Sequence, residues 1–119
     1  MARILVVDDD ESIRLLYKEE LQQEGHEVIT AATAAEGLAL VESARPDLVT
    51  LDIKMPGQDG LTALREFKAR YRNLPVIMCT AYGSFKKAYA SIASDAYVVK
   101  SADTTELKNA VSRVLSGRR

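Results

Sequence analysis

The chain lacks most of the features that mark specialised classes of protein. Its 119 residues include a single cysteine, and 16 basic and 17 acidic residues leave a net charge of −1. One cysteine cannot form an internal disulfide, but a chain of this length can bury a core without one. A nucleic-acid surface would need a basic stripe, and none is present. The apolar run at the N-terminus is too short for a signal peptide or a membrane span.

These absences favour one cytoplasmic domain over residues 1–119, with residues 116–119 as a frayed tail. Cys79 ends the apolar run Val76-Ile77-Met78-Cys79, which is typical of a small core residue in a reducing compartment. His26 is the only histidine and stands in the polar turn Glu24-Gly25-His26-Glu27. We interpret it as a structural surface residue, not as a metal ligand or a phosphorelay histidine.

Five short apolar runs alternate with five helical patterns along the chain. The runs are residues 4–7, 28–30, 48–51, 76–79 and 97–99, and each is continuous, as in strands buried on both faces. The first helix should end near Gly25, and Thr33 and Glu36 form a capping-box pattern that opens the second. Residues 103–106 resemble an acidic capping box before the last helix. This alternation predicts a doubly wound α/β fold with a parallel sheet.

In such folds the ligand site lies beyond the carboxyl ends of the strands. The first run ends in Asp8 and Asp9, the third in Asp52, the fourth in Thr80, and the fifth in Lys100. Each residue alone has an ordinary explanation as a helix-start, turn or surface residue. Together they predict clustered carboxylates whose repulsion a Mg²⁺ ion would relieve, with a lysine and a hydroxyl beside them. These groups suit phosphoryl transfer to an aspartate.

Other functions fit less well. A flavin-mononucleotide carrier would need a loop after the first strand that accepts phosphate, and the acidic residues 8–11 would repel one. An aspartyl phosphatase would need a second acid two residues after Asp52, where Lys54 stands. A structural calcium site would need more oxygen ligands and no lysine. A scaffold that binds partners without phosphorylation stays open as the alternative.

The chain resembles the receiver domains of bacterial two-component response regulators. The resemblance rests on the segments ILVVDDDESIR, PDLVTLDIKMPGQDG, VIMCTAYGS and YVVK, which span nearly the whole chain. It implies a flavodoxin-like five-stranded parallel sheet in the order 2-1-3-4-5 with five helices. The fourth helix should be short or irregular, because the segment from Thr80 to Lys100 is shorter than is usual in the family.

The resemblance also implies a chemical role for each matching residue. Asp52 would be the phospho-acceptor, and Lys100 would contact the phosphoryl group. Asp8, Asp9, Asp52 and the backbone carbonyl of Lys54 would bind Mg²⁺. The Lys54 side chain could shield the acyl phosphate from water, although a solvated lysine is an equally good interpretation.

The remaining matches concern the switch. Thr80 would contribute the switch hydroxyl and Tyr97 the switch aromatic ring, while Ala81 and Tyr82 would modulate access to the phosphoryl group. Phosphorylation would then change the surface of the fourth helix, fifth strand and fifth helix. Where the family usually has a cis proline after the lysine, this chain has Ser101. We therefore expect a trans bond there and a less firmly fixed Lys100.

The implied partners are a histidine kinase or histidine phosphotransfer protein, and a downstream target or an output domain outside this chain. No direct contact with nucleic acid or membrane is expected, and a phosphorylation-dependent dimer stays open. The protein would not be a conventional enzyme, although it would take part in its own phosphorylation and slow dephosphorylation.

Overall fold

The structure, a computed structural model, describes residues 2–52, 54–55, 58–80, 96–100 and 103–117. Five long strands alternate with helices, as the sequence predicted. The predicted fourth helix, whose apolar pattern is Phe85, Ala88, Tyr89 and Ile92, lies outside the described residues. The elements are β1 (Arg3–Val7), α1 (Glu11–Gln23), β2 (Glu27–Ala31), α2 (Ala34–Ala44), β3 (Leu48–Asp52), β4 (Lys54–Met55), β5 (Gln58–Asp59), α3 (Gly60–Arg70), β6 (Val76–Thr80), β7 (Ala96–Val99) and α5 (Thr105–Ser116).

The five long strands form one parallel sheet in the order β2-β1-β3-β6-β7. Since β6 and β7 are the fourth and fifth long strands, the predicted order 2-1-3-4-5 is confirmed. In the registers of the sheet, Val7 lies opposite both Ala31 and Leu51. The carboxyl ends of β1, β2 and β3 therefore meet at the same edge.

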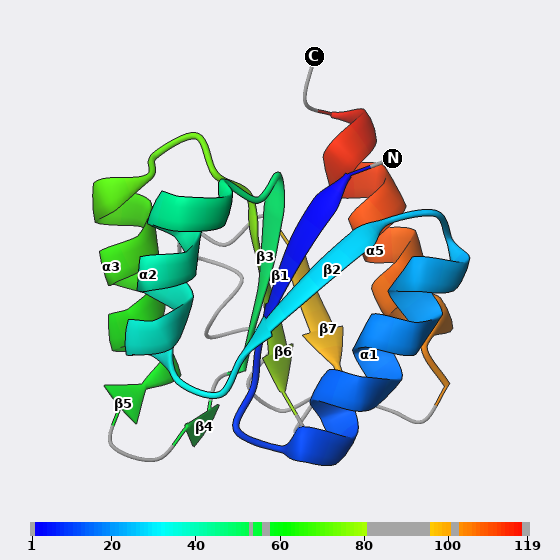
Figure 1. The fold of residues 1–119 in the computed structure, drawn as a ribbon, viewed down its shortest axis with the longest axis horizontal. Coiled ribbons are helices and arrows are strands. Elements are labelled where there is room, and N and C mark those ends of the chain that lie inside the picture. The colour runs from blue at the N-terminus through cyan, green and yellow to red at the C-terminus, as the bar shows by residue number, and fades with distance from the viewer. Residues whose placement is uncertain (1, 53, 56–57, 81–95, 101–102, 118–119) are drawn as a thin grey trace.

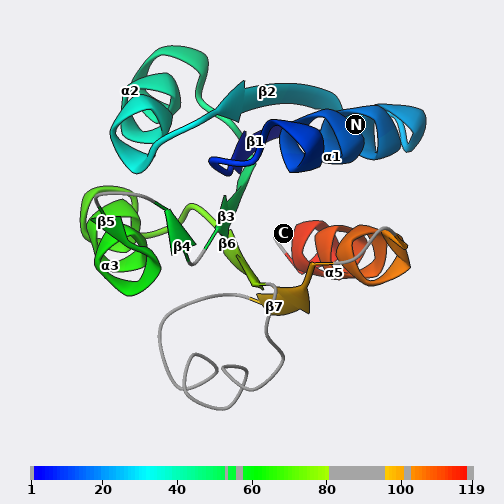
Figure 2. The same ribbon diagram turned by 90° about the horizontal axis from the view of Figure 1, so that it is seen from below.

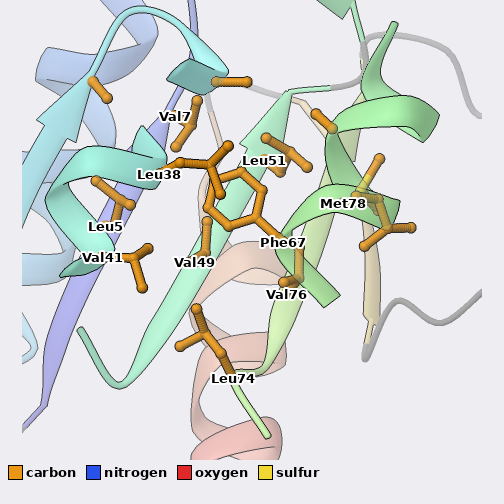
Figure 3. Packing of buried hydrophobic residues seen from close by; sticks show 14 residues of the cluster. Leu5, Val7, Leu38, Val41, Val49, Leu51, Phe67, Leu74, Val76 and Met78 are labelled. Carbon is orange, nitrogen blue, oxygen red and sulfur yellow. The ribbon is translucent and has the colours of Figure 1, made fainter. Parts of the chain in front are cut away.

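Helices cover both faces of this sheet. Helices α2 and α3 lie on one face, and α1 and α5 on the other (Figures 1 and 2). Successive side chains of a strand point to opposite faces. Accordingly, Leu5 and Val7 enter the core under α2 and α3, which Figure 3 shows, whereas Ile4 and Val6 enter the core under α1 and α5. Two buried faces explain why the strands are continuous apolar runs.

Helix α2 approaches the sheet closely because it carries glycine at position 37. A Cβ atom added there would lie 2.9 Å from Val7 Cγ2 and 3.3 Å from Phe67 Cζ. The first distance is shorter than carbon atoms in contact allow. Gly37 therefore lets α2, β1 and α3 share one tightly packed core.

The first two helices begin and end much as predicted. The backbone N–H of Gly25 donates to the Gln22 carbonyl at 3.0 Å, and its φ of +93° is a conformation that glycine adopts without strain. Thr33 Oγ1 accepts from the Glu36 N–H at 3.1 Å, as in a capping box. The Glu36 carboxylate reaches one residue further back than predicted and accepts from the Ala32 N–H at 2.7 Å.

The predicted acidic capping box at residues 103–106 was wrong. Thr104 is the N-cap residue of α5, and its side chain makes no capping hydrogen bond. Asp103 instead accepts from the backbone N–H of Thr105 at 3.0 Å and from its hydroxyl at 2.6 Å. The Glu106 carboxylate accepts from the N–H of Val99, at the end of β7.

The loop after Asp52 contains an element that the sequence patterns did not reveal. Strands β4 and β5 form a two-residue antiparallel pair, in which Lys54 lies opposite Asp59 and Met55 opposite Gln58. At the other end of the chain, α5 extends to Ser116, the first residue of the expected tail. Among the described residues, no helix combines the length and the apolar character that crossing a membrane requires.

Candidate functional site: an acidic cluster with a lysine at the sheet edge

The predicted site residues come together because of the topology. Asp52 is the last residue of β3, Asp8 directly follows β1, and Lys100 directly follows β7. Asp8 is two residues beyond Val6, and Asp52 is four residues beyond Leu48. Val6 and Leu48 belong to the core under α1 and α5, so alternation directs both carboxylates to that same face. The two acids therefore lie side by side at the edge of adjacent strands.

The Lys100 ammonium group bridges the two carboxylates. Its Nζ atom lies 2.7 Å from Asp8 Oδ2 and 2.9 Å from Asp52 Oδ1. The side chains of Asp8 and Asp52 are only 2% and 3% exposed, and that of Lys100 is 14% exposed. These are short, charge-assisted contacts that are largely shielded from water, so they are much stronger than ion pairs on the surface.

Asp9 supplies a third, exposed acid. One carboxylate oxygen from each of Asp8, Asp9 and Asp52 can be chosen so that all three lie within 4.8 Å of one another. Three negative charges at this range repel one another, and the Lys100 ammonium group offsets part of that repulsion. A divalent cation bound among the three carboxylates would relieve this repulsion.

The donor set fits Mg²⁺. This ion prefers oxygen ligands, uses one or two carboxylates and keeps several water molecules. The cluster offers three acids, two of them almost fully buried and one facing solvent, which leaves room for water on the exposed side. No histidine and no thiol belongs to the group, so the chemistry of the ligands favours magnesium over zinc or copper.

Backbone contacts hold Asp8 in place. Its Oδ1 atom accepts from the backbone N–H of Asp10 at 2.9 Å, and its Oδ2 atom faces the Lys100 ammonium group. Asp10 in turn caps α1 by accepting from the Ser12 N–H at 2.9 Å. The Arg14 guanidinium donates to the Asp8 carbonyl at 2.7 Å. This contact of Arg14 was not predicted from the sequence. A basic residue in the second turn of a helix gives no sign that its side chain binds the loop before the helix.

The protonation of Lys100 follows from two opposing effects. Burial of the ammonium group lowers its pKa, but the hydrogen bonds to Asp8 and Asp52 together with their negative charges raise it by more. The net result is a pKa above the ordinary value for lysine. Lys100 is therefore fully charged at neutral pH.

Two uncharged side chains, Cys79 and Tyr17, lie in the core next to the acids. The sequence patterns did not predict that they border the site. Cys79 lies opposite Asp52 in the sheet, and Tyr17, from α1, belongs to the same buried core cluster as Cys79. Burial is the main cause that raises the pKa of Cys79 to about 12 and that of Tyr17 above its ordinary range. Both groups therefore stay protonated. Cys79 is buried, as predicted, and it borders the acids directly.

Other predicted residues are described only in part. Thr80 ends β6 opposite Val99, and Tyr97 lies in β7 opposite Met78, so both stand on strands beside the cluster. Lys54 begins β4, two residues after Asp52. The side-chain roles assigned to these three residues remain predictions. Ala81, Tyr82 and Ser101 lie outside the described residues, as does the predicted trans peptide bond.

His26 lies at the opposite edge of the sheet from the acids. It directly precedes β2, whereas the cluster lies at the carboxyl ends of the strands. Its Nδ1 atom accepts from the backbone N–H of Ala2 at 3.2 Å. Burial lowers its pKa below the ordinary value for histidine. These contacts agree with the structural role predicted for it.

The parallel fold and the acidic edge define a class of protein, and comparison with known families identifies the same class. The family model for the response regulator receiver domain matches residues 4–112. The chain belongs to this family.

Particular relatives are similar over the whole chain. It is 37% identical to the sporulation initiation phosphotransferase F of Bacillus subtilis, with 95% of this chain and 93% of that protein covered. Among solved structures, the response regulator protein TrrA of Thermotoga maritima in complex with Mg²⁺-BeF is 46% identical with a TM-score of 0.89, covering 96% of this chain and 99% of that chain. A structure of the histidine kinase ThkA in complex with TrrA matches with 46% identity and a TM-score of 0.88, covering 97% and 99%.

Several other curated relatives are longer regulatory proteins. The chain spans between 24% and 48% of their length. The match to those proteins is thus a match to one of their parts.

Proposed function

We propose that the protein is a phospho-accepting signalling switch in which Asp52 receives a phosphoryl group from a phosphohistidine. The observation that carries this proposal is the position of Asp52, whose carboxylate is 3% exposed and lies 2.9 Å from the Lys100 ammonium within a three-acid cluster. An aspartate that only formed a turn would not need to be buried beside a lysine and two further acids. The proposal is also supported by TrrA, which has been solved with a histidine kinase.

In the proposed reaction a carboxylate oxygen of Asp52 attacks phosphorus in line with the bond to the histidine nitrogen. The new O–P bond forms as the N–P bond breaks, and the electron pair of that bond stays on the histidine nitrogen. The imidazole leaves as the neutral ring when its other nitrogen carries a proton, and otherwise it takes one proton from solvent. Negative charge on the phosphoryl oxygens must be balanced during this step. Lys100, already within hydrogen-bonding distance of Asp52, supplies a positive charge at that point.

Asp8, Asp9 and Asp52 would hold Mg²⁺, with the backbone carbonyl of Lys54 as a further ligand. When bound, the ion supplies positive charge that offsets both the repulsion among the acids and the charge of the phosphoryl oxygens. Asp8 and Asp52 share Lys100 in this structure, so each would also divide its oxygens between the ammonium group and the ion. TrrA in complex with Mg²⁺-BeF supports this assignment.

The phosphoryl group would act as a switch by drawing in nearby donors. The Thr80 hydroxyl and the Lys100 ammonium would bind the new oxygens, and the Tyr97 ring would then move into the space left by Thr80. This would change the surface formed by β7, α5 and the segment before them. Ala81 and Tyr82 would set access to the phosphoryl group, and Lys54 would slow its hydrolysis. The partners would be a histidine kinase or phosphotransfer protein and a downstream protein or output domain.

Mass spectrometry after incubation with acetyl phosphate tests the proposal. The wild-type protein should gain the mass of one phosphoryl group with Mg²⁺ and not with EDTA, and Asp52→Asn should gain none. Asp10→Asn is a matched control, because asparagine caps a helix as well as aspartate does and residue 10 is next to the cluster without belonging to it. This control should still be labelled. A wild-type protein that is not labelled would favour the scaffold alternative, and a labelled Asp52→Asn would refute the assigned acceptor.

A further inference from the structure

The segment that carries Lys100 is held by a carboxylate that the proposed reaction does not use. Lys100 follows β7, which ends the sheet and, among the described strands, pairs with β6 alone. Glu106, in the first turn of α5, accepts at Oε1 from the backbone N–H of Val99 at 3.1 Å. This contact fixes the residue directly before Lys100 at the open edge of the sheet.

The start of α5 is in turn tied to α1. Thr104 is 5% exposed, and its hydroxyl donates to Glu20 Oε1 at 2.9 Å. Lys108 Nζ lies 2.7 Å from the same oxygen. Helix α1 begins shortly after Asp8 and Asp9, so the helix that follows the acids also anchors the helix that supports Lys100. Glu106 therefore extends from a fixed base.

Such support matters because a lysine side chain is long and flexible. Its ammonium group acts as a point charge on four methylene groups and has no rigid fork to orient it. The ammonium group can lie 2.7 Å and 2.9 Å from its two partners only if the backbone at its base is held. The residue after Lys100 is serine, which lacks the ring that would stiffen the backbone there.

We propose that Glu106 is a positioning residue for Lys100: by binding the Val99 N–H, it holds the end of β7 so that the ammonium group faces Asp52. The inference rests on the proposed function of Asp52 and Lys100, and it deepens it. In this role Glu106 acts through the backbone that it fixes, and not by contact with the reacting atoms.

The phosphorylation rate with saturating acetyl phosphate and Mg²⁺ provides the first test. Loss of one hydrogen bond at an exposed site should slow Glu106→Ala roughly five- to tenfold. The dissociation constant for Mg²⁺ should stay within about twofold, because no metal ligand has been removed. Glu106→Gln should recover most of the rate, since its amide oxygen also accepts. Glu42→Ala, at an exposed glutamate of α2, is the matched control and should leave the rate unchanged.

A double-mutant cycle separates positioning from a general effect on the fold. If Glu106 acts through Lys100, then Glu106→Ala combined with Lys100→Ala should be no slower than Lys100→Ala alone. Two losses that multiply, or a Glu106→Gln variant as slow as Glu106→Ala, would overturn the inference. Free energies of unfolding, measured for all variants, show how much of each protein is folded during the assay.

A measurement without phosphate distinguishes this inference from the proposed function. In the unphosphorylated protein, the ¹³Cε signal of Lys100 should move toward the position of solvent-exposed lysines in Glu106→Ala and stay in place in Glu106→Gln. An unmoved signal in Glu106→Ala would overturn the positioning role even if Asp52 is phosphorylated. A moved signal would support the role even if the wild-type protein takes no phosphoryl group, in which case the proposed function alone fails.

Discussion

Replacing Lys100 by methionine should strongly destabilise the protein in the absence of Mg²⁺. Methionine keeps an apolar stem of similar length and removes the charge. The carboxylates of Asp8 and Asp52, 2% and 3% exposed, would then lie beside each other with no cation between them. Removing one partner of a buried ion pair typically costs about 3–5 kcal/mol, because the remaining charge is uncompensated.

Proton binding sets a limit to this cost. In the variant, one of the two carboxylates can become neutral by binding a proton. At pH 7 that costs about 4 kcal/mol, because each pH unit above the ordinary aspartate pKa of about 3.9 adds about 1.36 kcal/mol. At pH 5 the same step costs only about 1.5 kcal/mol. The loss of stability should therefore be about 4 kcal/mol at pH 7 and less than half of that at pH 5.

Urea unfolding followed by circular dichroism, with EDTA present, measures both values. Lys18→Met, at an exposed lysine of α1, is the matched control and should change the free energy of unfolding by less than about 0.5 kcal/mol. If Lys100→Met cost no more than Lys18→Met, the bridging ion pairs would contribute nothing to stability. An equal cost at pH 5 and pH 7 would show that the loss does not come from uncompensated carboxylates.

Three further predictions concern other parts of the molecule. Burial and a pKa of about 12 should keep the Cys79 thiol unreactive toward a disulfide reagent at pH 8, so reaction as fast as in urea would contradict its place in the core. The folded state lowers the pKa of His26, so it binds protons less well than the unfolded state, and stability should fall as pH falls through about 6.5. His26→Gln should remove that part of the pH dependence, and identical profiles for both proteins would refute it. Gly37→Ala should cost roughly 1–3 kcal/mol, because the new methyl group would lie 2.9 Å from Val7 Cγ2. Gly117→Ala, whose Cβ would lie no nearer than 3.6 Å to the atoms around it, is its control in the same unfolding assay.

The order of the strands and the cluster of acids could be predicted because both depend on rules that act along the chain. A continuous apolar run such as residues 4–7 indicates a strand covered on both faces, and alternation with helices makes the strands parallel. Parallel strands then bring their last residues to one edge. This is why Asp8, Asp52 and Lys100, far apart in sequence, could be assigned to one site before any distance was known.

What the sequence did not reveal depends on contacts in space. The Arg14 guanidinium donates to the Asp8 carbonyl, and Tyr17 packs in the same core cluster as Cys79, although both positions look like ordinary helix residues. Glu106 matched a local capping pattern, but its carboxylate binds Val99 because the open edge of β7 leaves an N–H within reach. Local patterns identify side chains able to accept a hydrogen bond, and tertiary packing selects the donor.

Locating the phosphoryl group on the chain tests the central claim most directly. After incubation with acetyl phosphate and Mg²⁺, borohydride reduction converts an aspartyl phosphate to homoserine, which peptide mass spectrometry can assign to one residue. The account predicts homoserine at position 52 and aspartate at positions 8 and 9. Homoserine at position 8 or 9, or unmodified aspartate at all three in a protein that had gained the phosphoryl mass, would contradict it.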